Sequence, residues 1–173
     1  MTSSGTQDHS IVFSNGASPA TLAADDWFIA AIGFEERSRW IAAEAWNRSL
    51  NGLAIGFGSR EELNFEQNRL FFDSSGLTFM RIVDSDFPAW TTGPFRTELD
   101  SHRRVHMDIS SFSRERLGYL MLEFWDWLRS GDRELTLWYA PARFEDSVTK
   151  FANSGVGIAD LLPGFEGNWV DPD

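Results

Sequence analysis

Five apolar runs, each followed by a polar segment, constrain the fold of this chain more than any other feature. The first, Trp27–Ile32, is continuous, as in strands whose two faces are both buried. The other four cover residues 53–57, 77–83, 105–109 and 135–139. Parallel neighbouring strands require crossover connections, which are nearly always right-handed. We therefore expect an α/β fold: a single Rossmann-like, doubly wound, mainly parallel five-stranded sheet with helices on both faces.

Helices are expected between most of these runs, because apolar residues recur there at helical spacing. One covers about residues 36–48, and a second contains Leu63, Phe65, Leu70 and Phe71. A third follows Ser113, which stands where a helix N-cap belongs. The prolines at 88 and 94 and Gly93 predict that residues 87–100 are irregular, with at most a short helix over 94–99. The apolar face of the third helix is expected to contain Leu117, Tyr119, Leu120, Met121, Phe124, Trp125 and Leu128.

The chain is expected to form one domain flanked by two different ends. Its 173 residues suffice for one sizeable core. Residues 1–24 are rich in Ser, Thr, Gly and Asp, and we predict a mobile arm. Residues 25–150 would form the α/β domain. Residues 151–173 combine acidic and apolar side chains without Lys or Arg, which predicts a tail that docks on the body or on a partner.

Composition excludes several classes of function. A formal net charge of −11 argues against general nucleic-acid binding, which needs clustered cations. The chain has no Cys, so disulfides and thiolate metal sites are excluded. His106 and Asp108 share a strand face, but two ligands are too few for a metal site. No apolar run is long enough to span a membrane, and the start lacks the features of a signal peptide. We expect a cytoplasmic protein that needs no metal or cofactor.

Two polar segments are predicted to meet at the carboxyl edge of the sheet. If the first strand is central, with the second and third on one side and the fourth and fifth on the other, the order reverses between strands 1 and 4. In open α/β sheets, ligands bind at that switch point. The segments that follow these two strands are residues 33–38 and 108–114.

The segment after the first strand holds four candidate ligand-binding residues, Gly33, Glu35, Arg37 and Ser38. Gly33 would let the backbone approach a ligand closely, and the start of the following helix would attract an anion. Alternatively, the acidic residues only complement the helix dipole, while Arg37 is solvated. The glycine spacing of a Walker loop or a dinucleotide fingerprint is absent.

The segment after the fourth strand is the stronger candidate. The hydroxyls of Ser110, Ser111 and Ser113 and the guanidinium of Arg114 could hold phosphate or ribose oxygens. Asp108 would accept a hydrogen bond from a sugar hydroxyl or a base N–H, because an unpaired acid is costly to bury. The alternative is that serine and aspartate serve only as turn and cap residues.

Two further residues could reach the same crevice or cover a ligand. Arg143 follows the fifth strand and is a further candidate for ligand binding. Trp90, in the stretch that contains both prolines, would stack on a ligand base or anchor a loop.

This arrangement resembles the CRISPR-associated Rossmann (CARF) sensory domains of bacterial conflict and defence systems. The resemblance covers about residues 25–150 and lies in the architecture, with ligand loops at residues 33–38 and 110–114. It implies that a cyclic oligonucleotide binds at the carboxyl edge of the strands, across a homodimer interface. The chain departs from the family in that the loop after the fourth strand has no glycine-rich turn.

Three functions are compatible with these observations. The first is a nucleotide or other phosphorylated-ligand binding domain that acts as a sensor or as a component of a bacterial defence assembly. The second is an enzyme of the nucleosidase or NAD-glycohydrolase type, in which Glu35 or Asp108 stabilises an oxocarbenium-like transition state. The third is a non-catalytic protein-interaction module, suggested by the acidic, apolar tail and by eight Trp and fifteen Phe.

Overall fold

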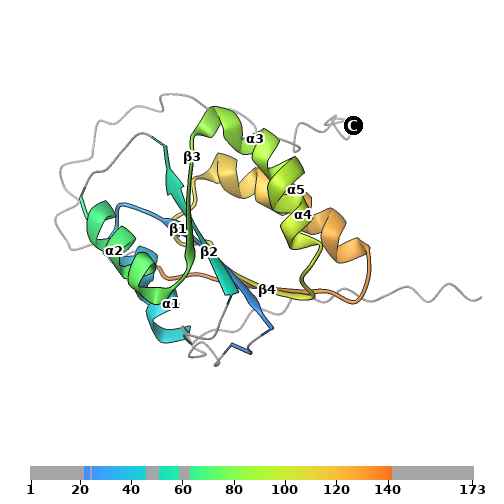
Figure 1. Ribbon diagram of the computed structural model, residues 1–173, viewed down its shortest axis with the longest axis horizontal. Coiled ribbons are helices and arrows are strands. Elements are labelled where there is room, and N and C mark those ends of the chain that lie inside the picture. The colour runs from blue at the N-terminus through green and yellow to red at the C-terminus, as the bar shows by residue number, and fades with distance from the viewer. Residues whose placement is uncertain (1–21, 24, 46–50, 59–62, 142–173) are drawn as a thin grey trace, which may run out of the picture.

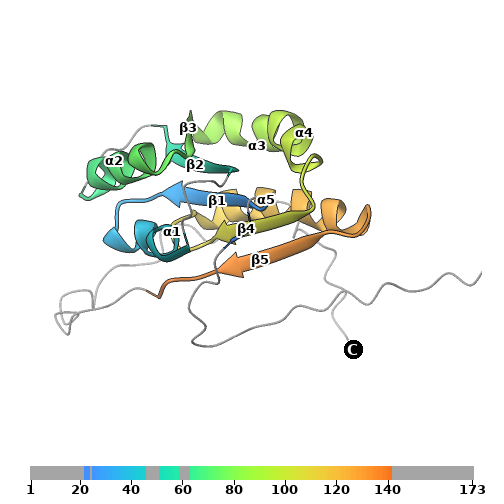
Figure 2. The same ribbon diagram turned by 60° about the horizontal axis from the view of Figure 1, so that its bottom comes forward.

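A five-stranded, all-parallel sheet forms the centre of the protein in a computed structural model that describes residues 22–23, 25–45, 51–58 and 63–141 (Figure 1). The strand order is β3-β2-β1-β4-β5, and Figure 2 shows the strands in this sequence from one edge to the other. Both the fold and the predicted strand order are therefore confirmed. The strands are β1 (Trp27–Ile32), β2 (Asn51–Phe57), β3 (Thr78–Ile82), β4 (Arg104–Asp108) and β5 (Glu134–Trp138).

Helices cover both faces of the sheet, as expected for a doubly wound fold (Figure 1). One face carries the 3-10 helix η1 (Glu36–Arg39) together with α1 (Trp40–Ala45) and α2 (Phe65–Ser75). The opposite face carries α3 (Phe87–Trp90), the π-helix η3 (Thr91–Phe95), α4 (Arg96–Leu99) and α5 (Arg114–Arg129). A short 3-10 helix, η2 (Asp84–Asp86), joins β3 to α3.

The central strand β1 explains why its sequence is apolar throughout. Trp27 and Ile29 point into the core beneath α3–α5, whereas Phe28, Ala30 and Ile32 point into the core beneath α1 and α2. All six residues of β1 are buried. A strand buried on both faces has no position left for a polar residue.

The segment between β3 and β4 corrects the prediction of an irregular stretch over residues 87–100. Residues 87–99 are helical throughout, in the order α3, η3, α4. Pro88 lies in the first turn, where a missing N–H costs nothing. Pro94 lies within the π-helical turn, and such a turn changes the backbone hydrogen-bonding pattern on which proline acts.

Two other predictions on helices are wrong. Trp125 was expected on the buried face of α5, yet it is 63% exposed. The buried stripe is centred on Leu120 and Phe124, and Trp125 lies roughly 100° further round the helix from Phe124. Leu63 was expected inside the second helix but is an exposed turn residue that precedes α2, with φ 53°.

Other predictions fall partly or wholly on residues that the structure does not describe. The first helix was expected to reach residue 48, and residues 46–50 lie outside the described part. The same holds for nearly all of the N-terminal arm and for the whole tail over 151–173. Of the arm, Leu22 is described, and it is buried against the core beneath α1 and α2. Among the described residues, no helix has the length and apolar character needed to cross a membrane.

Candidate functional site

The loops that follow β1 and β4 touch each other at the carboxyl edge of the sheet. Ala30 of β1 pairs with Asp108 of β4, so the residues beyond them leave the sheet side by side. A Cβ atom added to Gly33 would lie 2.6 Å from Cβ of Ser111. Only glycine fits at this contact, because real Cβ atoms do not approach that closely. The two loops are therefore neighbours, as predicted.

The loop after β1 is held in place by two polar side chains. Ser38 Oγ accepts a hydrogen bond from Gly33 N at 2.9 Å and donates one to Ala31 O at 2.7 Å. Asn68 Nδ2, from α2, donates to Gly33 O at 2.9 Å and to Glu35 O at 2.8 Å. The hydroxyl of Ser38, which the sequence suggested as a ligand contact, thus closes the loop on the end of β1.

Asp108 is the most unusual side chain of this edge. It ends β4, is 2% exposed, and accepts a hydrogen bond at Oδ1 from Ser110 N at 2.9 Å. Its other oxygen, Oδ2, is buried and has no hydrogen-bond partner among the described residues. Burial raises the pKa of the carboxyl group to about 6, although Ser110 and, more weakly, the charge of Arg37 oppose the rise. An acid that titrates close to neutrality is typical of functional sites.

Arg37 connects the loop after β1 with the end of β5. Its Nε lies 2.5 Å from Glu35 Oε2, and its Nη1 donates to Ala140 O at 3.0 Å. Ser110 Oγ accepts a hydrogen bond from Ala140 N at 2.7 Å. The segments after β1, β4 and β5 are therefore linked to one another beside the buried Asp108.

The start of α5 contributes the remaining candidates of the second loop. Ser113 is the N-cap of α5, and its side chain accepts a hydrogen bond from Arg116 N at 3.2 Å, so the cap prediction is confirmed. Arg114 is the first residue of the helix and is exposed. Arg143 lies outside the described residues.

Two polar residues at this edge were missed by the sequence reasoning. Asn68 is completely buried within an otherwise amphipathic helix, and its Oδ1 has no partner in the described part of the chain. Arg116 is 2% exposed, and its guanidinium pairs with Asp84 Oδ1 at 2.6 Å. A signal for Arg116 was present, because it lies four residues before Leu120 and so shares the buried stripe of α5.

The guanidinium of Arg116 also joins the carboxyl ends of two further strands. It donates to Ile82 O at 2.5 Å and to Gly56 O at 3.3 Å. The rings of Phe57 and Phe87 lie 4.4 Å and 4.7 Å from its Cζ atom. Arg116 therefore connects the start of α5 with β2, β3 and α3.

His106 forms a separate polar cluster on the same sheet face as Asp108. Its Nδ1 accepts a hydrogen bond from Trp138 Nε1 at 3.2 Å, and its Nε2 lies 3.3 Å from Asp26 Oδ2. Burial lowers the pKa of His106, and Asp26 opposes this in part. Within the described ranges, no group of three or more metal-ligating side chains is placed to hold an ion.

These features define the protein as a Rossmann-like α/β protein with a candidate ligand site at the topological switch point of its sheet. This chain matches no protein family, curated protein or solved structure with which it was compared.

Proposed function

We propose that the surface around Asp108 binds a nucleotide or another phosphorylated ligand, and that the chain is a sensor or a component of a bacterial defence assembly. The observation that carries the ligand proposal is the buried Oδ2 atom of Asp108 at the switch point of the sheet, which has no hydrogen-bond partner among the residues that the structure describes. The biological setting follows from the resemblance to CARF sensory domains.

Asp108 favours a ligand that donates hydrogen bonds. Leaving a buried carboxylate oxygen without a partner costs free energy, which a ligand donor would recover. A ribose hydroxyl or the N–H group of a base supplies such a donor. Ser111 lies at the same edge, in contact with the buried Gly33, and its partly exposed side chain could contact the same ligand.

Arg114 is better suited to the phosphate than Arg37. The guanidinium of Arg37 is already paired with Glu35, whose carboxylate would repel a phosphate. Arg114 begins a helix of sixteen residues, whose first N–H groups and macrodipole favour an anion. We therefore place the sugar or base near Asp108 and the phosphate at the start of α5.

Ligand-dependent thermal stabilisation tests this assignment, with AMP, ADP, NAD and a cyclic dinucleotide as probes. A ligand at about a hundred times its dissociation constant stabilises the folded state by about 2.7 kcal/mol. Arg114→Ala should lose most of this stabilisation. Arg129→Ala, at the other end of the same helix, is the matched control and should keep it. Equal stabilisation of both variants would refute the role of Arg114.

A second candidate function, N-glycoside hydrolysis, is favoured by the raised pKa of Asp108. A carboxyl group with a pKa of about 6 is largely ionised at neutral pH while remaining buried. The carboxylate would stabilise positive charge that develops at the anomeric carbon. Glu35 is the other candidate, and its side chain is more than half exposed and paired with Arg37.

Incubation with NAD and with nucleosides distinguishes the enzyme from the binding domain. An enzyme should release nicotinamide or the free base, and Asp108→Asn or Glu35→Gln should abolish that release. Binding without release of either product would leave the protein as a binding domain and exclude hydrolysis of these substrates.

A further inference from the structure

The geometry points to a second ligand site, at the opposite, amino-terminal edge of the sheet, for a small organic cation with an aromatic or alkyl body. A cavity of about 320 Å³ lies there between the first residues of β1–β3 and the segment α3–η3–α4. This inference does not depend on the function proposed for the carboxyl edge.

Three of the residues that line the cavity are aromatic. Trp27 contributes from β1, while Trp90 and Phe95 contribute from the helical segment above it. The ring centroids of Trp90 and Phe95 are 5.1 Å apart, and those of Trp27 and Phe95 are 5.6 Å apart. Tryptophan faces attract cations more strongly than other aromatic side chains do. Trp27 and Phe95 are only 3% and 1% exposed, and Trp27 also stacks on His102, so the partly exposed Trp90 is the ring most open to a ligand. The wall therefore suits a ligand that combines an apolar body with positive charge.

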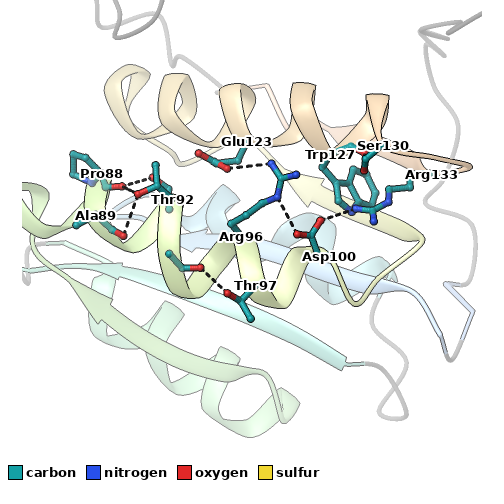
Figure 3. Close-up of polar contacts among 12 residues, drawn as sticks. Pro88, Ala89, Thr92, Arg96, Thr97, Asp100, Glu123, Trp127, Ser130 and Arg133 are labelled. Carbon is teal, nitrogen blue, oxygen red and sulfur yellow. Dashed lines mark hydrogen bonds and ion pairs between the residues drawn. The ribbon is translucent and has the colours of Figure 1, made fainter.

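The helical segment above the cavity contains the π-helical turn η3, a rare element that occurs frequently at functional sites. Its other side is tied to α5 and to the loop before β5 by polar contacts (Figure 3). Arg96 lies 3.4 Å from Glu123 and 3.2 Å from Asp100, and Asp100 lies 2.9 Å from Arg133. These contacts hold the segment in place, so the cavity is a pre-formed feature of the fold.

The charge of the lining decides which ligand fits. Glu98 of α4 is the charged residue among those that line the cavity, and its side chain is 57% exposed. One of its oxygens, Oε1, lies 3.4 Å from His102 Nε2, which is a long contact. A carboxylate at the rim of a cavity that Trp90 also lines favours an ammonium group and disfavours a phosphate or carboxylate. A cavity of this volume is at the small end of ligand sites, which suits an arylalkylamine better than a nucleotide.

The experiment compares three probes of nearly equal size, phenethylamine, phenylpropanol and hydrocinnamate, which carry positive, zero and negative charge. Binding is followed by NMR of the tryptophan indole N–H groups at millimolar probe concentrations. We expect phenethylamine to bind with the highest affinity and to shift the signals of Trp27 and Trp90. Equal affinity for all three probes, or no binding of any, would overturn the proposal.

Two variants locate the site and test the role of the charge. Glu98→Gln should weaken phenethylamine binding about fivefold and leave phenylpropanol unaffected. Glu115→Gln, an exposed acid in the first turn of α5, is the matched control and should change neither. Thr78→Phe, at an exposed position of the lining, should fill the cavity and abolish binding of both compounds. Unchanged phenethylamine affinity in Glu98→Gln or in Thr78→Phe would refute the assignment.

Discussion

Replacing Asp108 by asparagine should remove one contribution to the pH dependence of the free energy of unfolding, namely a loss of stability as the pH rises. In the unfolded chain this carboxyl group ionises near its ordinary pKa of 3.8, whereas in the folded protein burial raises its pKa to about 6. Between these two pH values the folded state holds a proton that the unfolded state has lost. Stability is therefore highest below the unfolded pKa and falls as the pH rises through the folded pKa.

The magnitude follows from the two pKa values. They differ by about 2.2, which at ~1.36 kcal/mol per pKa unit corresponds to about 3 kcal/mol in total. About 1 kcal/mol of this loss of stability falls between pH 5 and pH 7. No large reduction for solvent screening applies, because the side chain of Asp108 is 2% exposed. Asparagine does not titrate, so the variant lacks this contribution at every pH.

Urea unfolding at a series of pH values, followed by tryptophan fluorescence, measures the effect. The quantity of interest is the difference in unfolding free energy between the variant and the wild type, because the other acids contribute to both. As the pH rises, the variant should become more stable relative to the wild type. If it stays constant from about pH 4 to pH 8, the carboxyl group is not desolvated and the reasoning fails.

A pair of arginine variants provides the matched control. The positive charge of Arg37 lowers the pKa of Asp108, so Arg37→Gln should raise that pKa further. Arg39→Gln removes a charge from the same 3-10 helix, where it is paired with Glu36, and should leave the pKa of Asp108 unchanged. NMR titration of the carboxyl carbon of Asp108 reads both results directly.

Three further variants test how the site is built, each by urea unfolding. Gly33→Ala should destabilise the protein by roughly 1–3 kcal/mol because the new Cβ would overlap Ser111, whereas Gly131→Ala, with no atom within 4 Å, should have little effect. Ser113→Ala should cost about 1 kcal/mol through loss of the α5 cap, and equal stability would refute that role. Arg116→Ala should cost roughly 3 kcal/mol, because buried carbonyl groups lose their donor and a cavity remains.

The sheet could be predicted because its physical signals are local. A continuous apolar run such as Trp27–Ile32 indicates a strand covered on both faces, and the handedness of crossovers restricts the strand order. The helical segment over residues 87–99 could not be predicted in the same way, because the general rule treats proline as a helix breaker. Pro88 is tolerated because it lies in the first turn of α3, and Pro94 is tolerated because it lies in the π-helical turn.

The candidate site was predictable to the extent that it lies on two strand ends. The meeting of Gly33 with Ser111 follows from the positions of β1 and β4 in the sheet. The contribution of Asn68 depends on how α2 packs over the loop after β1, which sequence spacing does not reveal. Trp125 was misplaced because its spacing fits a broad apolar face, whereas the face that packs on the sheet is narrower.

The position of Arg116 has a mechanical consequence for the carboxyl edge. Its guanidinium is bonded to the ends of β2 and β3, while its backbone belongs to the first turn of α5. A displacement of that turn, such as one caused by a molecule bound to Arg114, would strain the hydrogen bonds to both strands. The ends of β2 and β3 would then respond to binding at the loops of β1 and β4.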